Sequence, residues 1–464
     1  MDAGLATADA TALADAIARK ELSSRELLDG YLERVERLNP ALNAVVTLDV
    51  ERARAAAAAA DDETARGVRR GPLHGLPITV KDAIEVGGIR STGGAVELSD
   101  HVPAADAPAV GRLRAAGAIV FGKTNVPRWS GDLQTFNELF GTTNNPWDTT
   151  RVPGGSSGGP AAAVAAGLTS FELGTDIGGS VRIPSHCCGV FGLKPSFGLV
   201  PQRGYLDHVG GGTTDADINV FGPIARSARD LGLLLSVLAG PEPEREVAWR
   251  VELPAPRQAS VAGLRVGVWF DEPSCPIDRE VLVLLQRAAD LLAGAGAKVE
   301  EAHPPVDFTE QYSLFVQLVT AAMSPSLDDA VADEMSGSHR SWLRADEQRA
   351  RLRTVWATWF ETYDALLCPV IPTPAFPHDQ EGELFTRTIT VNGEAVPYLN
   401  NVMWTGLIGV LGLPSAVPPI GRTPAGLPVG VQVVTPYLHD RNAIALAGQL
   451  ADLAGGYEPP PVAK

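Results

Sequence analysis

Cysteine is scarce in this chain. Among 464 residues there are four, at irregular spacings that suit neither a disulfide framework nor a cysteine-rich zinc site. We therefore predict a protein of a reducing compartment, the cytoplasm. The adjacent Cys187 and Cys188 are interpreted as packing residues rather than as a redox pair.

Positive charge is also in short supply. Lysine and arginine number 38 against 55 aspartates and glutamates, which gives a formal net charge of -17. A field of this sign argues against nucleic acid or an anionic membrane as the main partner. The chain has no uncharged apolar run of 18 residues, since three prolines interrupt 407–420. Its first ten residues lack the basic and then apolar pattern of a signal peptide.

The glycine-rich motif of dinucleotide binding is missing too. Glycine itself is common, with 48 residues, but GxGxxG does not occur. The glycines instead flank two serines, Ser156 and Ser180, which are joined by a small-residue segment that predicts a buried helix and a strand. Glycines allow positive φ and close approach, so a serine hydroxyl and the neighbouring N–H groups are exposed together in such turns. A reactive serine has to be displayed in this way.

Apolar periodicity predicts an α/β protein. Ser23 and Glu26 form a capping-box pattern that begins the second of two opening helices, and strands later alternate with helices. We find no internal repeat and predict one domain, 1–464. Within it, 1–65 is a helical segment and 66–240 is the core. Residues 241–260 form a linker or surface excursion, and 261–464 is an α/β and helical part. Strands are predicted at 78–82, 118–123, 264–270, 297–301, 365–367 and 429–435. Helices are predicted at 49–65 and 279–293, and 307–361 is predicted to be mostly helical.

Ser156 satisfies G-x-S-x-G, the nucleophile elbow of α/β-hydrolases. That elbow needs a strand before the serine and a helix after it. The helix is plausible, because Pro160 precedes the small-residue run 161–166. The strand is not, since 144–153 consists of turn-forming residues. The α/β-hydrolase interpretation is therefore disfavoured.

Ser180 is better placed for catalysis. It ends G-T-D-I-G-G-S, where successive N–H groups beside flexible glycines can point at one oxygen and form an oxyanion hole. No histidine base in a triad-like position accompanies it. A serine needs a base, and Lys81, at the end of the predicted strand 78–82, is the outstanding candidate.

Four motifs in order resemble those of the amidase signature family of serine hydrolases. They are G-L-P-I-T-V-K-D, G-G-S-S-G-G, G-T-D-I-G-G-S-V-R-I-P and C-G-V-F-G-L-K-P, beginning at Gly75, Gly154, Gly174 and Cys188. The resemblance extends from about residue 5 to 453. It implies the family's fold, a central mixed and twisted β-sheet with helices on both sides, and amide hydrolysis without metal or organic cofactor.

Carried over by position, the resemblance implies a Ser-cisSer-Lys triad. Ser180 is then the nucleophile, Ser156 the bridging serine after a cis peptide bond, and Lys81 the base. The separation of 24 residues between the serines selects Ser156 over Ser157 as the bridge. We expect burial away from carboxylates to lower the pKa of Lys81. The N–H groups of Ile177, Gly178, Gly179 and Ser180 are expected to hold the oxyanion.

Several neighbours are expected to support this triad. Asp176 and Arg182 are interpreted as supports of the nucleophile loop, with contact between Arg182 and a substrate carboxylate as the alternative. Thr175 is expected to hydrogen-bond the bridging serine. Further candidates are Ser157 as a support, and Trp129 and Gly155 as substrate contacts.

The substrate is predicted from two departures from the family's amidotransferase subunits. Ile183 stands after Arg182 where those subunits usually have glutamine, and 127–129 lacks their acidic pair. This favours a stand-alone amidase acting on uncharged, hydrophobic or aryl amides, with carbamates also considered. An apolar pocket is expected from the aromatic residues of 129–147 and from Phe315, Trp342, Trp356, Trp359, Trp404 and Leu407.

The sequence leaves two alternatives open. One is the glutamine-hydrolysing subunit of an aminoacyl-tRNA amidotransferase, which would need a partner protein. The other is a catalytically idle binding scaffold. The expected partner is a small-molecule amide, and the expected oligomeric state is monomer or homodimer.

Overall fold

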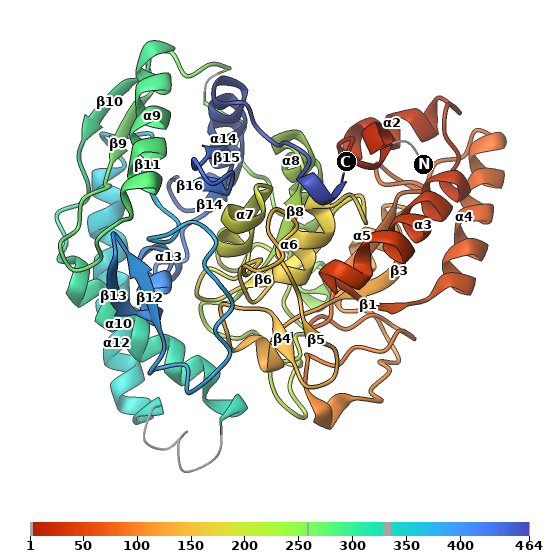
Figure 1. Ribbon diagram of the computed structural model, residues 1–464, viewed down its shortest axis with the longest axis horizontal. Coiled ribbons are helices and arrows are strands. Elements are labelled where there is room, and N and C mark those ends of the chain that lie inside the picture. The colour runs from red at the N-terminus through yellow and green to blue at the C-terminus, as the bar shows by residue number, and fades with distance from the viewer. Residues whose placement is uncertain (1–2, 258, 328–335, 464) are drawn as a thin grey trace.

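A large mixed β-sheet forms the centre of the computed structural model, which describes residues 3–257, 259–327 and 336–463 (Figure 1). Its order is β10-β9-β11-β16-β14-β7-β8-β6, and β15 pairs with β16 beside this path. The neighbours β10, β9 and β11 run parallel, and the other pairs are antiparallel. The strands are β6 Glu172–Asp176, β7 Phe191–Lys194, β8 Val220–Ala225, β9 Arg265–Val268, β10 Lys298–Glu301, β11 Ala365–Pro369, β14 Ser415–Val417, β15 Pro419–Arg422 and β16 Pro428–Val434.

A second sheet carries the lysine that the sequence singled out. It has the order β1-β3-β2, with β1 at Val45–Leu48, β2 at Pro77–Lys81 and β3 at Ile119–Thr124. All five residues of β2 are buried, and β2 packs beside β6 of the large sheet. Lys81 therefore ends a buried strand, as predicted, next to the strand that leads to Ser180.

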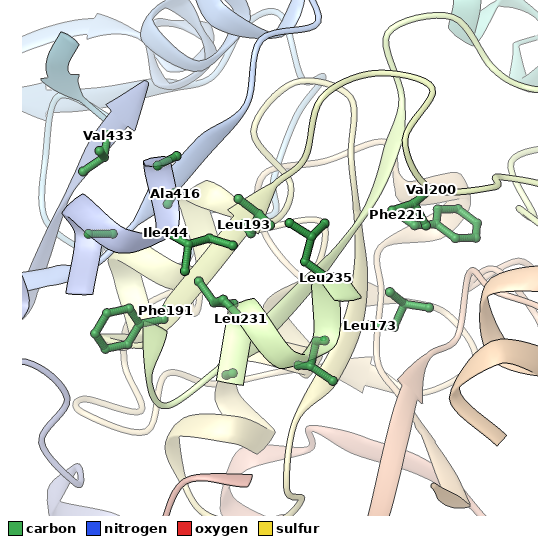
Figure 2. Close-up of a cluster of buried hydrophobic side chains, with 14 of the residues drawn as sticks. Leu173, Phe191, Leu193, Val200, Phe221, Leu231, Leu235, Ala416, Val433 and Ile444 are labelled. Carbon is green, nitrogen blue, oxygen red and sulfur yellow. The ribbon is translucent and has the colours of Figure 1, made fainter. Parts of the chain in front are cut away.

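Helices cover both faces of the large sheet, as the resemblance implied. On one face, Leu193 of β7 and Ala416 of β14 pack against Leu231 of α8 and Ile444 of α14 (Figure 2). The preceding strand residue, Gly192, points the other way, because a side chain there would meet Ser185 of α7. The helices are α1 Ala3–Ala6, α2 Ala10–Ala18, α3 Ser24–Leu42, α4 Val50–Ala65, α5 Pro108–Ala115, α6 Gly158–Ala165, α7 Arg182–Cys188, α8 Ala228–Leu238, α9 Arg279–Gly294, α10 Phe308–Met323, α12 His339–Trp359, α13 Met403–Gly409 and α14 Asp440–Ala454.

Local signals in the sequence are confirmed at the N-terminal end. The Ser23 side chain accepts from the Glu26 N–H and the Glu26 carboxylate accepts from the Ser23 N–H, which is the predicted capping box at the start of α3. The predicted helices 49–65 and 279–293 correspond to α4 and α9.

Two long segments lie outside the sheets. The described residues of 241–260 run over the surface, with a 3-10 turn at Pro243–Arg245, and Val247 is 90% exposed. Helices α10 and α12 fill most of 307–361, as predicted, but residues 328–335 of that stretch lie outside the described residues. The division of the chain into four parts stays a prediction. None of the helices in the described part of the chain combines the length and apolar character needed to cross a bilayer.

Candidate active site

Lys81 and Ser156 come together although they are 75 positions apart. The Lys81 Nζ lies 2.7 Å from Ser156 Oγ and 2.7 Å from Thr175 Oγ1, which belongs to β6. Lys81 and Ser156 are fully buried. The Thr175 hydroxyl thus contacts the lysine, whereas the sequence predicted a bond to the bridging serine. A buried amine is held between two hydroxyl groups.

The electrostatic setting of Lys81 differs in part from the prediction. Burial lowers its pKa well below the ordinary value, as expected, but Asp176 and Glu172 act in the opposite direction. The site is therefore not free of carboxylates. Burial also raises the pKa of Glu172 to about 8, so this group is mostly neutral at pH 7. It therefore counteracts the lowering of the Lys81 pKa less than a charged carboxylate would. Glu172 accepts hydrogen bonds from Thr79 and Thr124.

Burial alone does not identify the base, because two other lysines are also buried. Burial lowers the pKa of Lys123 to about 8 and that of Lys194 to about 7. The Lys123 Nζ donates to Ser91 Oγ at 2.8 Å, and the Lys194 Nζ donates to the Leu413 carbonyl at 2.9 Å. Contact with Ser156, rather than burial, distinguishes Lys81 from these two lysines.

The turn that carries Ser156 has the backbone that the resemblance implied. The Gly155–Ser156 peptide bond is cis, and Gly154 has φ 81°. An added Cβ at Gly155 would lie 2.5 Å from the backbone carbon of Leu133, so no larger residue fits. The structure thus gives Gly155 a role in packing, and its contact with substrate stays a prediction.

Asp176 organises the loop before Ser180. Its carboxylate accepts the N–H groups of Gly179 at 2.9 Å and Val181 at 3.1 Å, and it pairs with Arg182 at 2.7 Å. Burial opposes its ionisation, but the neighbouring Arg182 charge keeps the pKa of Asp176 below its usual value. These contacts fit the predicted supporting role of Asp176 and Arg182.

The alternative role for Arg182 is wrong. Its side chain is fully buried, and Nη1 donates to the Thr405 carbonyl at 2.8 Å and to Gln432 Oε1 at 2.7 Å. Since Nε and Nη2 both face Asp176, no nitrogen is left for a substrate carboxylate. The sequence shows an arginine near Ser180 but not which way its side chain turns.

The set of oxyanion donors also needs correction. The Gly179 N–H is engaged by Asp176, so it holds the loop in shape instead of pointing at an oxyanion. The N–H groups of Ile177, Gly178 and Ser180 are left as candidates. Ser180 is 4% exposed and Ile177 is partly buried, which places this loop at the edge of the buried site. The Ser157 N–H donates to the Ser180 carbonyl at 3.1 Å, so Ser157 ties the two serine turns together.

The predicted aromatic pocket is only partly assembled. An added Cβ at Gly178 would lie 3.5 Å from Phe315 Cζ and 3.8 Å from Val402 Cγ1, so these two side chains face the loop. Trp356 and Trp404 are fully buried in the core, and Trp356 donates to Gln311. Leu407 is fully buried as well, while Trp342 and Trp359 are partly buried beside the core. These five residues serve packing.

Two further residues bear on this site, one predicted from the sequence and one not. Trp129 is buried and has φ 53°, and its ring packs close to Gly93. Its contact with substrate stays a prediction. Tyr205 was missed. Burial raises its pKa to about 12, while Ser130 and Thr175, the residue that holds Lys81, act in the opposite direction. No motif marked this tyrosine, because its neighbours in the fold are distant in sequence.

No group of three or more histidine, cysteine, aspartate or glutamate side chains within 3–257, 259–327 and 336–463 is arranged to hold a metal ion. The four cysteines are buried and unpaired. Burial raises the pKa of Cys187 above its ordinary value, which fits the packing role predicted for it.

Known proteins share this sequence pattern and this fold. A family model described as Amidase matches residues 26–340 and 327–444. The chain is 33% identical over 463 residues to a glutamyl-tRNA(Gln) amidotransferase subunit of Roseiflexus sp., covering 90% of this chain and 91% of that protein. It is 33% identical over 473 residues to an indoleacetamide hydrolase of Bradyrhizobium diazoefficiens, covering 95% and 86%. A solved bacterial aryl acylamidase superposes with a TM-score of 0.83 at 27% identity, covering 96% of each chain.

Proposed function

The chain belongs to the amidase family and is an amide hydrolase, and from this premise we propose that Ser180, Ser156 and Lys81 cleave uncharged hydrophobic or aryl amides, and carbamates. The observation that carries the proposal is the 2.7 Å contact between the buried Lys81 Nζ and Ser156 Oγ. A lysine with a strongly lowered pKa can accept a proton at neutral pH, and it lies next to a hydroxyl that can relay one.

The proposed mechanism moves one proton along three side chains. Neutral Lys81 takes the proton of Ser156, and Ser156 takes the proton of Ser180 as the Ser180 oxygen attacks the carbonyl carbon. The N–H groups of Ile177, Gly178 and Ser180 stabilise the resulting oxyanion. The C–N bond then breaks, and the proton returns along the same path to the leaving amine. Water, activated by the same residues, hydrolyses the acyl-enzyme and releases the carboxylic acid.

Three features support an uncharged, hydrophobic substrate. Phe315 and Val402 are apolar and face Gly178 of the nucleophile loop. Arg182 is fully used within the protein, so it offers no positive charge to an anionic acyl group. The names of two relatives, an indoleacetamide hydrolase and an aryl acylamidase, point to amides with aromatic groups. Carbamates are included because the same attack on a carbonyl carbon releases an amine from them.

The amidotransferase alternative is favoured by one observation, the similarity to subunits of that name. Against it, the position after Arg182, where those subunits usually have glutamine, holds the apolar Ile183. This side chain is fully buried and would lie 2.8 Å from a Cβ added at Gly179, so an apolar group supports the loop. The two functions differ in a simple assay. An amidotransferase subunit needs its partner to hydrolyse glutamine, whereas the proposed enzyme cleaves amides as a purified chain.

Active-site labelling tests the proposal. A fluorophosphonate should label the purified chain at Ser180, and Ser180→Ala should lose both labelling and turnover of anilides, primary amides and carbamates. Ser236→Ala, on the exposed side of α8, is the matched control and should keep both. Unchanged turnover in Ser180→Ala would overturn the catalytic assignment. An unlabelled, inactive wild-type chain would point to the idle scaffold, and equal turnover of malonamate and anilides would overturn the preference for uncharged amides.

A further inference from the structure

A cavity of about 510 Å³ lies away from the serines, between the end of α12 and the turn after α13. Its apolar wall is formed by Phe197, Phe360, Leu411, Leu413 and Pro436. None of the residues that line it belongs to the turns 153–158 or 176–182 that carry Ser156 and Ser180. The volume falls within the range of small-molecule sites, about 300–1,000 Å³. The cavity is therefore large enough to hold a ligand of its own.

One guanidinium faces this apolar wall without a counter-ion. Arg353 is partly buried, and its Nε donates to the Leu411 carbonyl at 2.8 Å. One turn earlier in α12, Arg349 pairs with Asp217 at 2.8 Å and with Asp346 at 2.6 Å. No such carboxylate pairs with Arg353 among residues 3–257, 259–327 and 336–463. A partly desolvated and unpaired positive charge is costly, and a bound anion would offset that cost.

The other charged groups at the cavity do not supply that anion. Arg257 also lines it, but Arg257 already pairs with Asp364 at 3.3 Å and is half exposed. Glu361 lies on an exposed position at the rim. The Tyr437 hydroxyl donates its proton to the Phe197 carbonyl at 2.8 Å, so this proton is engaged within the protein. Arg353 is left as the one partly buried cation of the cavity that lacks a carboxylate partner in the described part of the chain.

We propose that this cavity is a second binding site, for an apolar monocarboxylate whose carboxylate pairs with Arg353 and whose hydrocarbon body covers Phe197, Leu411 and Leu413. A guanidinium holds a carboxylate through two parallel hydrogen bonds, which its remaining Nη atoms can supply. The ligand class is that of the acids released when hydrophobic amides are hydrolysed. The site itself stands on the cavity and on Arg353, so it does not depend on the proposed triad.

Calorimetric titration of the full chain with phenylacetate tests this site. We expect saturable binding that persists after fluorophosphonate treatment, because the ligand does not occupy the catalytic site. Arg353→Gln should weaken binding at least tenfold, since a charged hydrogen-bonded pair is lost. Arg351→Gln, two residues away on the same helix and 78% exposed, is the control and should bind like the wild type.

Two further measurements keep the proposal open to refutation. Ala357 lines the cavity from an exposed position, so Ala357→Trp should fill the space and abolish binding without disturbing the core. The neutral analogue 2-phenylethanol should bind at least tenfold more weakly than phenylacetate. Equal affinity of wild type and Arg353→Gln, equal affinity for the two probes, or loss of binding on fluorophosphonate treatment would each overturn the second site.

Discussion

Thr175 Oγ1 lies 2.7 Å from Lys81 Nζ, the same distance that separates this nitrogen from Ser156 Oγ. A neutral amine has two N–H groups and one lone pair. If it donates to Thr175, its lone pair is free to accept the proton of Ser156. Thr175 therefore orients the proposed base.

Replacement of Thr175 tests this orientation. Thr175→Val keeps the shape of the side chain but removes the acceptor, so we expect kcat to fall about tenfold, the effect of roughly one hydrogen bond. The matched control is Thr124→Val, which loses a buried hydroxyl that contacts Glu172 instead of Lys81. Steady-state kinetics of both variants, with thermal unfolding to compare stability, checks the expectation. Equal losses in the two variants would contradict it.

The pH dependence of activity should report the protonation of Lys81. The proposed base works only when neutral, and burial lowers its pKa, so kcat/KM should rise as pH increases through that lowered pKa and be high at neutral pH. Lys81→Met should reduce kcat by at least about 10³-fold at every pH. A pH–rate profile on an uncharged anilide measures both. If an active Lys81→Met protein still showed the rise of kcat/KM on the acidic side of the profile, that rise would belong to another group.

Arg182 is expected to be essential for stability through Asp176. Arg182→Met leaves the Asp176 carboxylate buried without its ion pair, which should cost about 3–5 kcal/mol of unfolding free energy. Adding Asp176→Asn should recover part of this loss, because the uncompensated charge is then removed. The exposed pair of Arg54 and Asp29 is the comparison, and Arg54→Gln should cost less than about 1 kcal/mol. Urea denaturation measures all three variants.

Glu172 should make stability fall as pH rises from about 4.5 to about 8. In this window the folded state holds the proton because burial raises the pKa of Glu172 to about 8, whereas the unfolded state has released it. Glu172→Gln removes this contribution. The variant should therefore gain stability relative to the wild type as pH increases across the window. The test is to measure the unfolding free energies of both proteins at several pH values. A difference between them that stays constant with pH would contradict the prediction.

Gly178 offers a test of the apolar pocket. A Cβ there would make ordinary contacts with Phe315 and Val402, so Gly178→Ala should fold normally. It should also narrow the space beside the nucleophile loop and raise KM for bulky aryl amides more than for acetamide. Gly232→Ala, at a position with open space, is the control and should change neither. A uniform loss for large and small substrates would speak against a pocket at this position.

The loop before Ser180 could be predicted because it is built locally. Asp176 binds groups three to six residues ahead in the chain, so the motif carries most of its own geometry. The direction of the Arg182 side chain was not predictable, since Thr405 and Gln432 lie more than 200 positions away. Strands β8 and β14 were also missed. Both contain or adjoin proline, and only their neighbours in the sheet hold them extended.

The sequence by itself determined the family, the alternation of strands and helices, and the two serine turns, because glycine spacing and hydrophobic periodicity act over a few residues. Only the tertiary structure decided which hydroxyl groups face Lys81, since contacts across 75 and 94 positions depend on how β2, β6 and the Ser156 turn pack. It also decided that Trp356 and Trp404 belong to the core while Phe315 faces Gly178. An apolar side chain leaves water as favourably for a pocket wall as for the protein core, so composition cannot distinguish a core residue from a pocket residue.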